Sequence, residues 1–116
     1  MAATPDPAAA FCYLTTTGRR SGNPHEIEIW FGMFGSTAYM LCGGGVSDWV
    51  KNIRADSSVK IRIGGETFDA VGRIVDDPTE DALARRLLLD KYANSGEDLA
   101  DWGKTALPVA ADILAV

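Results

Sequence analysis

Short segments in which apolar and polar residues alternate make up much of this chain, and glycine-rich turns separate them. In the segment 25–31, for example, Ile27, Ile29 and Phe31 fall on one side and their neighbours on the other. This period of two is the pattern of a strand with one buried face. The segments that read as strands are 11–17, 25–31, 37–42, 59–63, 66–75 and 107–114. Because tight turns join most of them, we predict a mainly β fold, a six-stranded antiparallel barrel.

A few helical segments interrupt the strands and are expected to cover the barrel. The first, 48–55, follows Ser47, a residue type that favours the N-cap position. The second begins at Pro78, has acidic residues in its first turn, and is expected to end near residue 95. A short third helix is expected at 98–105, and residues 32–36 are expected to form a turn.

The composition narrows the class of protein. A chain of 116 residues is the size of one domain, and we expect residues 1–10 to form a flexible tail before a single domain at 11–116. The net charge of −5 argues against a nucleic-acid partner. Cys12 and Cys42 fall in expected strands, which predicts two buried reduced thiols and a cytoplasmic protein. No pattern indicates a metal site, a secretory leader or membrane attachment.

A turn between the first two expected strands holds the residues that most suggest a binding site. It reads Thr17, Gly18, Arg19, Arg20, Ser21 and Gly22, and His25 follows shortly after. Glycines let a backbone approach a ligand, and guanidinium groups bind phosphate or carboxylate oxygens in pairs. The same residue types also build ordinary hairpin connections, and His25 could equally pair with Glu26 or Glu28. The residues therefore leave both an anion site and a plain exposed turn open.

Four motifs, in this order, resemble the deazaflavin-dependent nitroreductase family, a family of split β-barrel oxidoreductases that use coenzyme F-420. They are the segment 14–24 (LTTTGRRSGNP), the glycines at 43–45, the segment 48–56 (DWVKNIRAD) and the strand 59–63 (VKIRI). The resemblance covers residues 11–109. It implies a six-stranded split barrel like the FMN-binding barrels, with a deazaflavin held in a groove.

The resemblance also implies which residues form the site. The turn would hold the cofactor's phosphate, with Arg20 in place of the family's usual lysine. The residues assigned to the cofactor are Thr17, Gly18, Arg19, Arg20, Ser21, Gly22, His25, Ile27, Gly43, Gly44, Gly45, Asp48 and Trp49. Those assigned to the wall of the acceptor pocket are Trp30, Tyr92 and Trp102. Trp49 also reads as a core anchor of its helix, and Asp98 reads as a surface acid.

The activity implied by the resemblance is transfer of a hydride from reduced F-420 to a small electron-poor acceptor, such as a quinone, a nitroaromatic or a conjugated enone. This chemistry depends on positioning more than on side-chain catalysts, so no residue is assigned a catalytic role. Ile27 and Glu28 stand where family nitroreductases often have an Asn-Pro pair, and Trp30 stands where the family has a tyrosine. Two alternatives stay open: a protein that carries a deazaflavin or flavin without turnover, and a barrel that uses FMN or haem. We expect a monomer or a homodimer.

Overall fold

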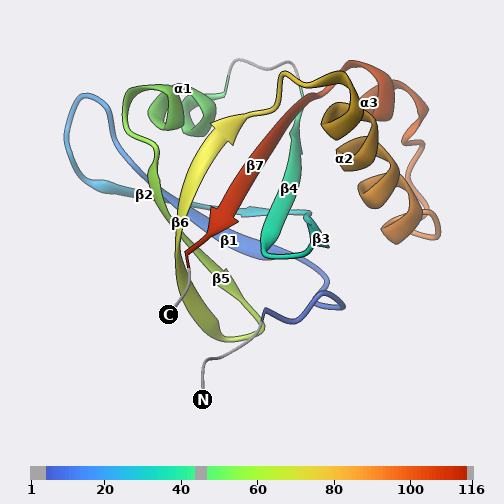
Figure 1. The fold of residues 1–116 in the computed structure, drawn as a ribbon, viewed down its shortest axis with the longest axis horizontal. Coiled ribbons are helices and arrows are strands. Elements are labelled where there is room, and N and C mark those ends of the chain that lie inside the picture. The colour runs from blue at the N-terminus through green and yellow to red at the C-terminus, as the bar shows by residue number, and fades with distance from the viewer. Residues whose placement is uncertain (1–4, 44–46, 115–116) are drawn as a thin grey trace.

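The computed structural model describes residues 5–43 and 47–114, so Gly44 and Gly45 of the expected cofactor site lie outside the described residues. Within these ranges, seven strands form one antiparallel sheet in the spatial order β2-β1-β5-β6-β7-β4-β3. The strands are β1 (Cys12–Thr17), β2 (Pro24–Ile29), β3 (Gly32–Phe34), β4 (Thr37–Cys42), β5 (Ser58–Ile63), β6 (Glu66–Ile74) and β7 (Leu107–Ile113). Figure 1 shows that the sheet curls on itself. This architecture confirms the predicted fold class, an open antiparallel barrel with covering helices.

One strand more than expected is present among the described residues, so the prediction of six was wrong in number. Residues 32–36 do not all form a turn: Gly35, with a φ of 60°, and Ser36 make a two-residue turn. That leaves Gly32–Phe34 free to pair with the start of β4. Glycine suits position 32 of this strand, because a Cβ there would lie 3.0 Å from the Cβ of Leu87.

The helices cover the curled sheet from two sides, as Figure 1 shows. The helix α1 (Asp48–Ala55) packs on β1 and β6, and α2 (Pro78–Lys91) packs on β3, β4 and β7. The short helix α3 (Ala100–Thr105) packs against α2. Within the described ranges, 5–43 and 47–114, no helix is both long enough and apolar enough to cross a membrane.

The residues that precede α1 and α2 differ in how they cap these helices. Asp77 caps α2, since its carboxylate accepts the backbone N–H of Glu80 at 2.9 Å. Ser47 is the N-cap of α1, as expected from the sequence, but its side chain makes no capping bond. The Ser47 hydroxyl instead lies 3.3 Å from the Sγ of Cys42.

Two apolar clusters form the core, one on each side of β4. Met40 and Cys42 belong to the cluster inside the curl, with α1, whereas Tyr39 and Leu41 belong to the cluster beneath α2. Successive side chains of a strand point to opposite faces, so a strand that is covered on both faces is apolar throughout. Cys12 and Cys42 are both buried, as expected, and neither forms a disulfide with the other.

Candidate functional site

The turn between β1 and β2 is closed by its own backbone. The N–H of Gly18 donates to the carbonyl of Asn23, and the N–H of Gly22 donates to the carbonyl of Gly18, both at 2.8 Å. Gly22 has a φ of 74°, and a Cβ on Gly18 would lie 2.7 Å from the Oγ of Ser21. The positive φ therefore favours glycine at position 22, and the close neighbours leave little room for a side chain at position 18.

Arg19 fastens this turn to α1. Its backbone N–H and its Nη1 donate to the Oδ1 of Asn52, at 3.2 and 3.0 Å, and its Nη2 lies 3.2 Å from the carboxylate of Asp48. Asn52 is only 3 % exposed and also donates to the hydroxyl of Thr16 at 3.1 Å. Two of the expected site residues, Arg19 and Asp48, thus bind each other. Asn52 was not predicted, because within its helical motif nothing distinguishes it from a surface residue.

The side chains of Arg20, Ser21 and His25 are exposed around a concavity of about 300 Å³. Gly18, Arg19, Asp48 and Asn52 also line it, so the turn and the start of α1 form its walls. No ion pair within the described ranges involves Arg20 or His25. A guanidinium, a hydroxyl and an imidazole that face one concavity make a donor set suited to a phosphate or carboxylate.

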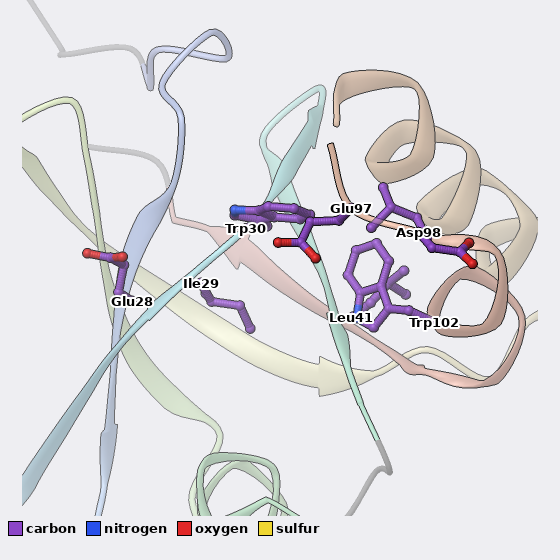
Figure 2. Close-up of a pocket in the computed structure, with 8 residues that line it drawn as sticks. Glu28, Ile29, Trp30, Leu41, Glu97, Asp98 and Trp102 are labelled. Carbon is purple, nitrogen blue, oxygen red and sulfur yellow. The ribbon is translucent and has the colours of Figure 1, made fainter. Parts of the chain in front are cut away.

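A second concavity, of about 440 Å³, lies further along β2 and has aromatic walls. The ring of Trp30 stacks on that of Tyr92, with centroids 4.1 Å apart and planes within 5°. Trp102 meets Trp30 edge-on, at 5.9 Å and 88°. The structure therefore brings together all three residues that were expected in the acceptor pocket. The residues that line this space, drawn in Figure 2, are Glu28, Ile29, Trp30, Leu41, Glu97, Asp98, Leu99 and Trp102.

Tyr92 supports this pocket from behind rather than lining it. Its buried hydroxyl donates to the carbonyl of Ala10 at 2.8 Å and accepts the N–H of Phe31 at 3.0 Å. Burial raises the pKa of Tyr92, so the hydroxyl keeps the proton that it donates. The ring of Tyr92 thus holds the side chain of Trp30, and its hydroxyl holds the backbone of Phe31. The contact with Ala10 falls inside the segment 1–10, whose expected role as a flexible tail stays a prediction.

The remaining expected residues lie in different environments. Trp49 is 6 % exposed and packs in the core cluster under α1. Ile27 is partly buried against the same cluster. Gly43 is exposed at the end of β4, and a Cβ there would lie 3.9 Å from the Cδ1 of Trp102. Gly43 therefore adjoins the aromatic pocket.

Three carboxylates at this pocket were not expected there. Glu28, Glu97 and Asp98 all line it, and Figure 2 shows the carboxylate of Glu97 beside Trp30, whereas the carboxylates of Glu28 and Asp98 point away from the two indole rings, at the margins of the pocket. Asp98 had read as a surface acid. The signal that could have placed it is its position just before the short helix that carries Trp102.

Comparison with known proteins adds a family and a fold. The family model described as "F420H(2)-dependent quinone reductase" matches residues 4–113. A solved F420-H2 dependent reductase, FDR-A, is 17 % identical with a TM-score of 0.71, covering 88 % of this chain and 93 % of that one. A second, described as an F420 reductase, is 17 % identical with a TM-score of 0.64, covering 92 % and 88 %. An FAD-binding protein from Mesorhizobium loti is 12 % identical with a TM-score of 0.67, covering 94 % and 84 %. No curated protein matches the sequence.

Proposed function

This chain belongs to the F420H(2)-dependent quinone reductase family, an oxidoreductase family that depends on the deazaflavin F-420, and from that premise we propose that it reduces quinones or similarly flat, electron-poor acceptors. The observation that carries the proposal is the pair of concavities along β2. One is lined by exposed side chains of types that can donate hydrogen bonds to an anion, and the other is lined by two tryptophans.

The two concavities suit an elongated ligand with an anionic part and a flat part. His25 lines the first and Ile29 lines the second, and four residues of extended strand span about 13 Å. The donor set of Arg20, Ser21 and His25 fits the phosphate of F-420. The glycine at position 43 leaves room beside Trp102 for the backbone to approach a flat ring.

The chain's own part in the reaction is to bind, orient and shield. Bound reduced F-420 supplies a hydride, the chemistry that this chain's side chains lack. A quinone that accepts this hydride and one proton from water becomes the hydroquinone. The walls of Trp30 and Trp102 hold a planar acceptor in one orientation, and such positioning accounts for much of the rate of a transfer between two bound molecules.

Acceptor-dependent oxidation of the cofactor tests the activity. We expect the protein to oxidise reduced F-420 when menadione is added, at a rate proportional to enzyme concentration and well above the rate without protein. Tight cofactor binding with no oxidation by menadione, a nitroaromatic or a conjugated enone would support a carrier instead. Competition by FMN in the same titration would show whether the site accepts a flavin.

A cofactor titration tests the anion site. We expect Arg20→Ala to weaken binding of F-420 by about tenfold, because a charge-assisted hydrogen bond to an anion contributes about 1.5–3 kcal/mol. Arg86→Ala is the matched control, since it removes an exposed guanidinium from α2. Equal affinities of the Arg20→Ala variant and the unaltered chain would remove the phosphate role of the turn.

A further inference from the structure

The aromatic pocket combines two features that favour positively charged ligands. The ring of Trp102 meets that of Trp30 edge to face, at 88° and 5.9 Å, and Tyr92 covers one face of Trp30, so a ligand in the corner beside the two rings meets indole surfaces of different orientation. Indole faces attract cations through the ring quadrupole, and cages of aromatic residues bind quaternary ammonium groups. The arrangement of the two indole rings is thus one feature that favours a cation, and the charges around the rings are a second, separate one.

The charges at the pocket have one sign. Among its eight lining residues, three are carboxylates and none is a lysine, arginine or histidine. Glu28 accepts a hydrogen bond from the hydroxyl of Tyr13 at 3.0 Å, and Asp98 accepts one from the N–H of Ala100 at 3.1 Å. Neither bond neutralises a carboxylate. No ion pair within residues 5–43 and 47–114 involves Glu28, Glu97 or Asp98.

The electrostatic contrast with the turn is sharp. At the other concavity along β2, Arg19, Arg20 and His25 outnumber the one carboxylate, that of Asp48, whereas all the charged residues that line the tryptophan pocket are acids. An anionic group is therefore attracted to the turn and repelled at the tryptophans, and a cationic group is affected in the opposite way. This division would keep the anionic parts of a cofactor out of the acceptor pocket.

We propose that the pocket formed by Trp30, Trp102, Glu97 and Asp98 selects flat acceptors that carry a positive charge and rejects anionic ones. The inference rests on the proposed function, because it names the acceptor class for the same pocket. The charged group of such an acceptor takes no part in the redox step. The quinone ring gains the hydride and one proton, and the positive group remains bound between the indoles and the carboxylates.

Matched acceptors test this selectivity. We would compare three naphthoquinones with the same linker, ending in a trimethylammonium, a neutral or a sulfonate group. At low ionic strength we expect kcat/KM for the cationic compound to exceed that for the anionic one by about tenfold or more. The ratio should shrink in about 0.5 M salt, because exposed charges are screened. Equal values, or a preference for the sulfonate, would overturn the proposal.

Variants assign the selectivity to particular side chains. We expect the double variant Glu97→Gln with Asp98→Asn to reduce the cationic-to-anionic ratio to about a third or less, since exposed charge pairs contribute modestly. The asparagine retains an oxygen that can accept the N–H of Ala100. Glu66→Gln removes one negative charge from the β5–β6 hairpin and should leave the ratio unchanged. A ratio that survives the double variant would overturn the assignment.

A binding measurement separates this proposal from the proposed function. Quenching of tryptophan fluorescence by the three naphthoquinones, without cofactor, reports on Trp30 and Trp102, while the buried Trp49 gives a constant background. We expect the same order of affinity, with the trimethylammonium compound tightest. If no quinone oxidises reduced F-420, the reductase proposal fails and the order of quenching still decides the selectivity. Equal quenching by the charged compounds would overturn it.

Discussion

At the scale of single residues, Tyr92 matters most to the pocket without lining it. It stacks under Trp30, and its hydroxyl bridges the chain at Ala10 to the chain at Phe31. Lys91, the residue before it, also donates to the carbonyl of Phe31 at 3.0 Å. Burial lowers the pKa of Lys91. The end of α2 thus holds the segment that follows β2, and with it Trp30, which lines the aromatic pocket.

Replacing Tyr92 by phenylalanine removes the hydroxyl and keeps the stacking ring, so it measures the contribution of the hydroxyl alone. We expect Tyr92→Phe to lower the free energy of unfolding by about 1–3 kcal/mol, because the buried N–H of Phe31 loses its acceptor. The KM for a quinone should rise as Trp30 becomes less fixed. Urea denaturation and steady-state kinetics measure the two effects.

Tyr13→Phe is the control for this change. It deletes another tyrosine hydroxyl, one that bonds to the exposed carboxylate of Glu28, and it should change stability by less than about 0.5 kcal/mol. Similar losses in both variants would contradict the special role given to Tyr92.

At the scale of elements, one buried amide joins α1 to the turn between β1 and β2. Asn52 contacts Arg19 through two donors and Thr16 through its own N–H group. We expect Asn52→Ala to destabilise the fold by about 1–3 kcal/mol, because it leaves buried polar groups without partners. It should also weaken F-420 binding, since Arg19 is no longer fixed.

Lys51→Ala, an exposed change in the same helix, provides the stability control and should stay within about 0.5 kcal/mol of the unaltered chain. Unfolding of Asn52→Ala at the same urea concentration as Lys51→Ala would show that the amide does not join these elements.

The contact between β3 and α2 gives a second prediction at this scale. A Cβ at position 32 would meet the Cβ of Leu87 at 3.0 Å, and this atom cannot rotate away from the helix backbone. We expect Gly32→Ala to cost about 1–3 kcal/mol through overpacking. For comparison, Gly43→Ala would meet only Trp102, at 3.9 Å, and should be nearly neutral in thermal denaturation. Equal melting temperatures would argue that α2 moves freely over β3.

These elements also show what a sequence can predict. Alternation along β2 and β5 is local, so strands and their buried faces were predictable from residue order alone. The exact turn between β3 and β4 was not, because the sequence makes Gly32 and Gly35 equally suited to turns. Only the structure shows that Gly35 has the positive φ, whereas Gly32 packs closely against Leu87. The prediction that Trp30, Tyr92 and Trp102 share one pocket came with the family resemblance. Periodicity could not have made it, because these residues are far apart in the sequence. The carboxylates beside them had no local pattern.

At the scale of the whole molecule, one arginine links several elements. Arg73 on β6 makes two contacts of 2.6 Å with Glu80 on α2, and its Nε lies 2.7 Å from the carboxylate of Asp112 on β7. From β4, Tyr39 donates to Glu80 at 2.6 Å and Thr37 donates to Asp112 at 2.7 Å. Burial, with the bond to Glu80, raises the pKa of Tyr39 to about 12, so its hydroxyl remains a donor at neutral pH.

This network should make the stability of the fold depend on pH in acid. Hydrogen bonds from Arg73 hold the pKa values of Glu80 and Asp112 below their ordinary values of 4.5 and 3.8. As pH falls through those ordinary values, the unfolded chain binds more protons than the folded one, so the free energy of unfolding decreases until the folded carboxylates are themselves protonated. We expect the Arg73→Gln variant to be less stable than the unaltered chain at pH 7 and to lose less stability between pH 5 and pH 3, so that the stability curves of the two proteins converge in acid.

The control is Lys60→Gln, which breaks an exposed pair with Asp69. Its stability curve should follow that of the unaltered chain, since such pairs contribute little. Urea denaturation at several pH values measures the slopes, and parallel curves for Arg73→Gln and the unaltered chain would mean that other carboxylates govern the acid response.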